Sequence, residues 1–172
     1  MPHLPQHLPQ HGVLLEINAI GVYLIGESGI GKSEIALQLI QNGASLICDD
    51  APEFTINSPQ TQVIGHCPED FISLMHIHDL GVINVRTLFG EQFAKNSSPI
   101  HFIIHLLKAN DRLEIINQQT PEQLLQPNDQ QWQFQAINIP GINLHLYPGR
   151  NIIAIIKTAL LQFSNYDRID AS

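Results

Sequence analysis

The stretch Gly26-Glu27-Ser28-Gly29-Ile30-Gly31-Lys32-Ser33 matches the pattern G-x-x-x-x-G-K-[ST] at every fixed position. The apolar residues 21–25 precede it and predict a buried strand. Residues 32–43 follow it and predict an amphipathic helix that ends at a glycine. A strand and a helix on either side make this loop typical of phosphate binding. The alternative is a tightly packed glycine-rich turn that binds nothing.

The chemistry of this loop predicts its ligands. Its glycines let backbone N–H groups turn toward phosphate oxygens, and the start of the helix adds partial positive charge. We expect Lys32 to reach the β- and γ-phosphates, and the Ser33 hydroxyl to help hold Mg²⁺. All eight residues of the loop are therefore predicted to bind a nucleotide, ATP with Mg²⁺.

Composition narrows the class of protein. The chain has 172 residues, of which 44% are hydrophobic and 14% charged, so it has enough apolar side chains for one folded domain. The net charge of −8 argues against nucleic-acid binding. No apolar run has the length of a membrane span, and the first residues do not resemble a signal peptide, so no membrane contact is expected. Cys48 and Cys67 lack metal-type spacing, which favours a reducing cytoplasm and predicts Cys48 as an inert core thiol.

Short strands dominate the rest of the pattern, which predicts an α/β fold with few helices. Residues 1–10 are rich in proline, histidine and glutamine and predict a flexible lead-in to a domain over 11–172. The predicted strands are 12–17, 21–25, 45–48, 53–56, 62–66, 74–77, 100–107, 132–139 and 142–147. Besides the helix after the loop, helices are predicted within 82–89 and over 150–163. Residues 117–131 predict a mobile connection, with a helix start at Thr120-Pro121-Glu122.

Two adjacent carboxylates, Asp49 and Asp50, end the strand that follows the first helix. In most strand–loop–helix–strand folds this position lies near the phosphate loop. One carboxylate can hold Mg²⁺, and the other can accept the proton of an attacking hydroxyl. The alternative is a solvated turn acid beside a helix cap.

Several blocks of the chain, taken in order, resemble the bifunctional HPr kinase/phosphorylases of bacteria over residues 11–165. The blocks are His11-Gly12-Val13, the loop continuing into Glu34-Ile35-Ala36-Leu37, Leu46-Ile47-Cys48-Asp49-Asp50, Leu80-Gly81-Val82-Ile83-Asn84-Val85 with residues 86–90, Asp111-Arg112-Leu113 and Pro148-Gly149-Arg150-Asn151. The Leu-Gly-x-Ile-Asn-Val block is the most specific of these, because ordinary phosphate-loop NTPases lack it.

The resemblance implies a fold and a function. The fold is a phosphate-loop-containing, phosphoenolpyruvate carboxykinase-like core with a mixed, mostly β sheet framework. The chain would be a short form of the family, without its separate N-terminal domain. The function is an ATP-dependent protein serine kinase acting on an HPr-like phosphocarrier, with the reverse phosphorylase reaction in the family. Members are cytoplasmic homo-oligomers, in this family hexamers.

The resemblance also implies roles for single residues. Asp50 would be the general base when phosphate is transferred to a serine, and the general acid when it is removed. Asp49 would support the metal, and His11 matches an active-site histidine. Arg112 would stabilise charge on the transferring phosphoryl group, and Arg150 matches a region used chiefly in dephosphorylation.

The chain departs from the family at His76-Ile77-His78-Asp79, where relatives have Glu-Ile-Arg-Gly, and at Tyr147, where a basic residue is usual. The family glutamate is a Mg²⁺ ligand, so the metal ligands here would be Ser33, Asp49 and His76, and imidazole favours Mn²⁺ as the alternative ion. Asp79 or Asp49 could also substitute for the glutamate.

Three alternatives remain open at this point. His76 and His78, with Asp79 or His66, could form a transition-metal site. Both histidines could instead point into the protein. The departures also leave a second function, a nucleotide-binding regulatory or sensor protein with degenerate phosphoryl transfer.

Overall fold

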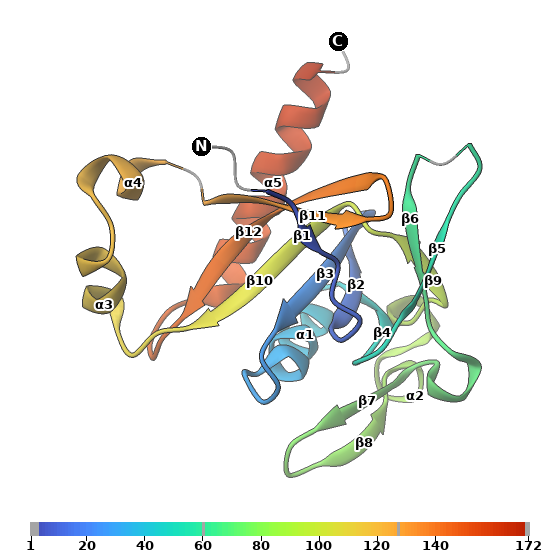
Figure 1. Ribbon diagram of the computed structural model, residues 1–172. Coiled ribbons are helices and arrows are strands. Elements are labelled where there is room, and N and C mark those ends of the chain that lie inside the picture. The colour runs from blue at the N-terminus through green and yellow to red at the C-terminus, as the bar shows by residue number, and fades with distance from the viewer. Residues whose placement is uncertain (1–3, 60, 127, 171–172) are drawn as a thin grey trace.

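A seven-stranded mixed sheet forms the centre of the molecule (Figure 1). The structure is a computed structural model that describes residues 4–59, 61–126 and 128–170. Across the sheet the strands are β1 (Gln6–His7), β11 (Asp129–Phe134), β12 (Ile137–Leu146), β10 (Phe102–Lys108), β3 (Ile20–Gly26), β2 (Val13–Ile17) and β4 (Ser45–Cys48). A three-stranded sheet has β5 (Glu53–Ile56), β6 (Val63–His66) and β9 (Ser97–Pro99), and a hairpin has β7 (Leu74–Ile77) and β8 (Gly81–Asn84).

The helices are few, as the sequence predicts. They are α1 (Lys32–Gln41), α2 (Val85–Phe89), α3 (Arg112–Asn117), α4 (Pro121–Leu125) and α5 (Ile152–Asp170), with short 3₁₀ turns at η1 (Glu69–Phe71) and η2 (Glu91–Phe93). In the described part of the chain, no helix has the length and apolar character needed to cross a membrane.

Strand directions bring the candidate site residues to one edge of the large sheet. Strands β10 and β12 run parallel to β3, whereas β2 is antiparallel both to β3 and to β4. Therefore β3, β4, β10 and β12 all end at the same edge, and β2 begins there (Figure 1). Ligands of open α/β sheets bind at such an edge, outside the carboxyl ends of the strands.

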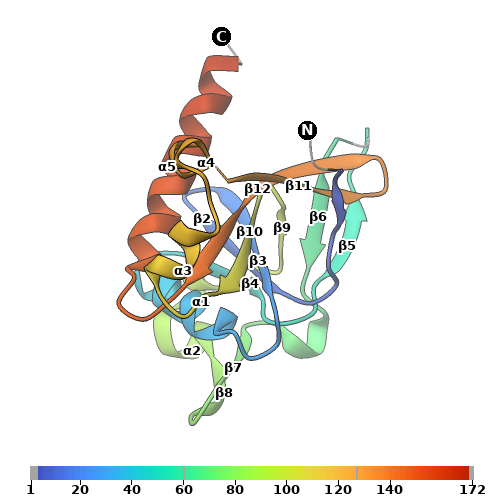
Figure 2. The same cartoon turned by 60° about the vertical axis from the view of Figure 1, so that its left-hand side comes forward.

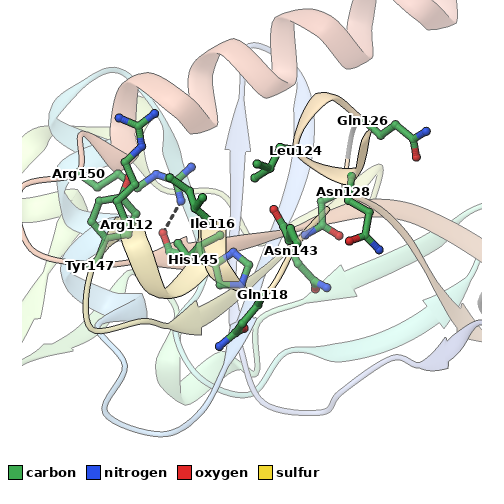
Figure 3. A pocket seen from close by; sticks show the side chains of 13 residues that line it. Arg112, Ile116, Gln118, Leu124, Gln126, Asn128, Asn143, His145, Tyr147 and Arg150 are labelled. Atoms are coloured by element: carbon green, nitrogen blue, oxygen red, sulfur yellow. Dashed lines mark hydrogen bonds between the residues drawn. The ribbon is translucent and has the colours of Figure 1, made fainter. Parts of the chain in front are cut away.

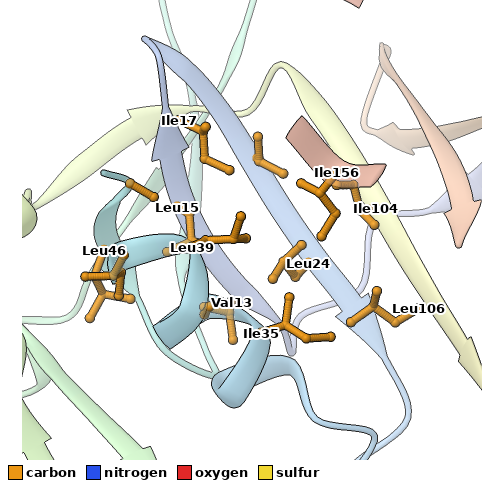
Figure 4. Close-up of a cluster of buried hydrophobic side chains, with 14 of the residues drawn as sticks. Val13, Leu15, Ile17, Leu24, Ile35, Leu39, Leu46, Ile104, Leu106 and Ile156 are labelled. Atoms are coloured by element: carbon orange, nitrogen blue, oxygen red, sulfur yellow. The ribbon is translucent and has the colours of Figure 1, made fainter. Parts of the chain in front are cut away.

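The core lies on both faces of the large sheet. On one face, residues such as Leu15, Leu24 and Ile104 pack against α1 and α5, as Figure 4 shows. On the other face, Tyr23 and its neighbours pack against residues of the three-stranded sheet. The turned view in Figure 2 separates α5 from the β5–β6 arm. Because β3 is covered on both faces, its sequence is continuously apolar rather than alternating. Each fully buried side chain of this kind contributes about 1.5–3 kcal/mol.

The short helix predicted within 82–89 is confirmed as α2, which occupies the second part of that range. Residues Gly81–Asn84 form β8, and the helix begins only at Val85. Gly81 has a φ of 79°, which closes the turn from β7, and the Asn84 side chain accepts a hydrogen bond from the Thr87 N–H at 3.0 Å. A hairpin followed at once by a capped helix has no clear period, so the sequence pattern located the helix but missed β8.

The two strands predicted at 132–139 and 142–147 are divided at the wrong place. The turn lies at Gln135, with a φ of 52°, and β12 continues through Pro140. Pairing of β12 with β10 starts at Gly141, so Pro140 has a sheet neighbour only in β11, opposite Gln131. A proline is tolerated where no second strand needs its missing N–H.

The two segments predicted as mobile contain ordered elements. In the lead-in, Gln6–His7 pair with β11, the Leu8 N–H donates to the Gln133 carbonyl at 2.9 Å, and Leu8 is buried. Residues 1–3 lie outside the described residues. In the connection, Thr120 and Gln123 form a capping box that starts α4. Strand pairing and the buried Leu8 thus order the first segment, and a local capping box orders part of the second, although both have the composition of a loop.

Candidate active site

The phosphate loop joins β3 to α1 as predicted. Gly29 and Gly31 have φ values of 79° and 108°, and a Cβ atom at either position would meet nothing within 4 Å. The left-handed backbone, and not lack of space, therefore requires glycine here. Gly31 is the N-cap of α1 and has no side chain to cap it, so the first N–H groups of the helix can bind an anion.

Lys32 lies over this loop. Its Nζ atom donates to the carbonyl oxygens of Gly26 and Glu27, at 2.9 Å each. These bonds hold the ammonium group beside the backbone that would enclose the phosphates. The position fits the predicted contact of Lys32 with phosphate oxygens.

Asp49 is the most tightly held acid of the site. The Ser33 hydroxyl donates to Asp49 Oδ1, and the backbone N–H of His76 donates to Asp49 Oδ2, both at 2.9 Å. Burial raises the pKa of Asp49, and the two hydrogen bonds oppose this shift without cancelling it. Hydroxyl and carboxylate oxygens are the donors that Mg²⁺ prefers, so Ser33 and Asp49 fit this ion.

Asp50 lies at the surface beside His11. His11 Nδ1 is 3.6 Å from Asp50 Oδ1, and the two side chains are 74% and 77% exposed. The Gly12 N–H donates to the Asp50 carbonyl at 2.7 Å, and a Cβ on Gly12 would approach the Leu24 carbonyl to 2.5 Å. Asp50 has a φ of 82°, a left-handed conformation that costs about 1–3 kcal/mol in residues other than glycine. Such strain is common at functional sites, and here it directs a carboxylate toward solvent.

The β7–β8 hairpin presents its histidines to solvent. The side chains of His76 and His78 are exposed, so the alternative that both point into the protein is wrong. His76 contacts the site through its backbone N–H, while His78 Nε2 lies 3.5 Å from Asp79 Oδ1 in the turn. His66 is engaged elsewhere, 2.7 Å from Thr55 Oγ1. Among the described residues, no three histidine, cysteine or acidic side chains are grouped to hold a metal, which gives the transition-metal alternative no support.

A cavity of about 650 Å³ contains both predicted arginines. Figure 3 shows Arg112, Arg150 and Tyr147 gathered at one end, with Asn128 and Gln126 at the other. Arg150 Nη1 donates to the His145 carbonyl at 2.6 Å, and its guanidinium lies 5.2 Å from the centre of the Tyr147 ring. Burial, and then the charge of Arg150, lower the pKa of His145. None of the described residues that line this cavity is acidic.

A smaller cavity of about 260 Å³ connects this region with the phosphate loop. It is lined by Glu27 and Ile30 of the loop, and it shares Ile115, Gln118 and His145 with the larger cavity. The arginines therefore lie on one side of the loop, beyond β10, whereas Asp49 and Asp50 lie on the other, at the end of β4. No described contact joins the two groups.

The sequence reasoning missed some residues of the cavity. Asn143 and His145 line it together with Tyr147. These three alternate along a strand that was predicted, so a period of two in polar residues was the available signal. Gln118 carried no such signal, because it follows the short helix α3, which was not predicted.

Comparisons with known proteins agree with this arrangement. The family model for the HPr Serine kinase C-terminal domain matches residues 3–170. HPr kinase/phosphorylase of Xylella fastidiosa (strain M12) is 37% identical over 167 residues, and that of Stenotrophomonas maltophilia (strain K279a) is 36% identical over 167. Each alignment covers 91% of this chain and 51% of the relative, so the chain spans about half the length of the curated relatives that it matches.

A solved structure confirms the fold. The Hpr(Ser) kinase/phosphatase from Coxiella burnetii superposes with a TM-score of 0.80 at 31% identity, covering 94% of this chain and 95% of that chain. The expected phosphate-loop, phosphoenolpyruvate carboxykinase-like core with a mixed sheet and few helices is therefore correct.

Proposed function

Because the chain belongs to the family of HPr serine kinase C-terminal domains, we propose that it is an ATP-dependent protein serine kinase whose acceptor is an HPr-like phosphocarrier. One observation carries the proposal. Ser33 of the phosphate loop is hydrogen-bonded to Asp49, and the next residue, Asp50, is an exposed carboxylate. A glycine-rich loop, a hydroxyl–carboxylate pair suited to Mg²⁺ and an exposed carboxylate thus lie at one edge of the sheet.

In this proposal the loop and Lys32 bind the phosphates of ATP. Ser33 and Asp49 would hold Mg²⁺, with His76 beside them, and the ion would neutralise phosphate charge. Asp50 accepts the proton of the acceptor serine, because its carboxylate is exposed and it directly follows Asp49, which is bonded to Ser33 of the loop. His11 lies beside Asp50, with Nδ1 3.6 Å from Asp50 Oδ1.

The arginines would act from the other side of the loop. Arg112 and Arg150 are permanent cations in a cavity that the smaller cavity connects to the loop, so they can attract the charge that spreads over the transferring phosphoryl group. In the reverse direction a protonated Asp50 would act as the acid. Tyr147 stacks on Arg150 where relatives have a basic residue, so we propose that the reverse reaction is weaker than the kinase reaction.

We further propose that the chain works in the cytoplasm as a homo-oligomer, with residues 11–172 as the catalytic domain. A second candidate function is a nucleotide-binding regulatory protein with degenerate phosphoryl transfer. The exposed His76 and His78, where relatives have a glutamate and an arginine, favour that candidate.

The deciding experiment follows label from ATP to a protein. The purified chain would be incubated with γ-labelled ATP, Mg²⁺ or Mn²⁺, and an HPr-type protein, with the Ser→Ala form of that acceptor as control. We expect label on the wild-type acceptor alone. Nucleotide binding without any label transfer, with either ion, would instead establish the regulatory candidate.

A further inference from the structure

The small cavity of about 260 Å³ beside the phosphate loop has largely apolar walls. Ile30 lines it from the loop and Ile115 lines it from α3, and both side chains are half-buried. Leu106 and Leu107, near the end of β10, line it as well. Apolar side chains from three elements thus border one space, as is usual in sites that bind small organic molecules.

The end of β10 offers an open backbone edge to this cavity. Pairing of β10 with β3 ends at Leu106 and Gly26, where β3 passes into the loop, but pairing with β12 continues to Lys108. The Ala109 N–H donates to the Leu146 carbonyl of β12 at 2.9 Å. Because successive residues of a strand alternate in direction, the N–H and carbonyl of Lys108 point to the β3 side. No described strand pairs with Lys108 on that side, so one donor and one acceptor are available there.

The charges of the small cavity differ from those of the cavity that contains the arginines. Glu27 and Glu114 line the small cavity, and among its described lining residues only Lys108 carries an ammonium group. Glu114 Oε2 accepts a hydrogen bond from the Asn110 N–H at 2.6 Å, which holds this carboxylate in place. Two carboxylates disfavour a phosphate group here, and they can only accept hydrogen bonds. The cavity therefore suits an uncharged group that carries hydrogen-bond donors.

We propose that the small cavity binds the adenine base of ATP, which contacts Ile30 and Ile115 and places its polar edge on the backbone of Lys108. The inference rests on the proposed function. Ser33 and Asp49 hold the metal end of the nucleotide on the β4 side of the loop, so its nucleoside end extends to the β10 side, where the cavity lies. Adenine has an amino donor beside a ring-nitrogen acceptor, which matches a backbone carbonyl and N–H.

The experiment compares two ligands on the intact chain by calorimetry, each with Mg²⁺. ATP carries phosphates and a base, whereas tripolyphosphate carries phosphates alone and reports on the loop. We expect Ile115→Ala to weaken ATP binding by about tenfold or more and to leave tripolyphosphate binding unchanged, since even one methylene in an apolar pocket is worth about tenfold. Unchanged tripolyphosphate binding also shows that the variant folds. Ile115→Val, a milder change, should give a smaller loss in the same direction.

The matched control is Ile116→Ala, because Ile116 is the next residue of α3 and lines the larger cavity but not the small one (Figure 3). It should bind both ligands as the wild type does. Equal affinities of the wild type for ATP and tripolyphosphate, or equal losses of ATP binding in the two alanine variants, would overturn the inference. If the chain bound neither ligand, the proposed function would fail together with it. The expected binding pattern without any label transfer would leave the base site standing and refute the kinase alone.

Discussion

The two sides of the phosphate loop are built in different ways. On the metal side, which comprises His11, Ser33, Asp49, Asp50 and His76, hydrogen bonds from α1 and β7 hold the Asp49 carboxylate, and the Gly12 N–H holds the Asp50 backbone. On the arginine side, which comprises Arg112, His145, Tyr147 and Arg150, the side chains line a wide cavity. Arg112 is exposed at the start of a helix of six residues.

This difference indicates which part of the reaction each side can control. Groups that are already held in place stabilise charge without having to reorganise during the reaction. The metal side is therefore suited to binding the nucleotide phosphates and the cation. An open cavity can admit a second molecule and adapt to it. We therefore expect substitutions on the metal side to affect the rate steeply, and substitutions on the arginine side to affect it less.

The largest effect is expected from Asp50→Asn. The amide keeps the shape of the side chain but cannot accept the serine proton, so phosphoryl transfer should fall by about 10²–10⁴-fold. Asparagine tolerates the left-handed backbone at this position, so the variant should fold and bind ATP. A label-transfer assay measures phosphoryl transfer, and calorimetry measures ATP binding. Asp70→Asn, at an exposed position, is the matched control. Near-normal turnover of Asp50→Asn would move the base to another residue.

The next effect is expected from Lys32→Ala. Loss of a charge-assisted contact to phosphate should weaken ATP binding by about 1.5–3 kcal/mol. Calorimetric titration with Mg²⁺–ATP measures it, and Lys157→Ala removes the same charge from an exposed position on α5. Equal affinities in wild type and Lys32→Ala would contradict phosphate binding by this residue.

A smaller effect is expected from His76→Glu, which sharpens the assignment of the metal side. The His76 backbone N–H binds Asp49 and its side chain is exposed, so a carboxylate at this position should raise Mg²⁺-supported activity relative to Mn²⁺-supported activity. Activity in each ion gives the ratio, and His78→Arg is the matched change at the turn of the same hairpin. An unchanged ratio with lowered stability would show that His76 serves the hairpin alone.

The smallest effect concerns the stability of the arginine side. The pKa of His145 is lowered from 6.5 by burial and by Arg150, so protonation disfavours the folded state. The free energy of unfolding should therefore keep its full contribution from neutral His145 above pH 6.5, and it should fall as the pH drops below that value. His145→Asn should lose less stability over that acid range. Thermal unfolding measured as a function of pH checks this. Between about pH 7 and 8, above the ordinary pKa of histidine, the stabilities of the wild type and of His145→Asn should change in parallel. If the two stability curves stayed parallel at every pH, His145 would not be the cause of the loss of stability in acid.

The sequence predicted the metal side better than the arginine side, for a physical reason. The phosphate loop, its strand and its helix follow from local residues: glycines at positive φ, an apolar run and an amphipathic period. Asp49 was found because it directly follows a strand. Its partner, the His76 N–H, could not be found, since a backbone donor leaves no mark in the sequence. The cavity is formed where β12 meets α3 and α4, and contacts between segments so far apart in sequence have no local pattern.

The position of β3, the strand that precedes the phosphate loop, determines when the loop becomes ordered during folding. In the finished sheet β3 lies between β2, its neighbour in sequence, and β10, with Tyr23 opposite Ile103. The hydrogen bond from the Gly21 N–H to His101 alone spans 80 residues. During synthesis the β2–β3 hairpin can form early, but one edge of β3 has no partner until β10 has left the ribosome. Pairings of such separation form slowly, so the loop should gain its rigid support among the last steps of folding.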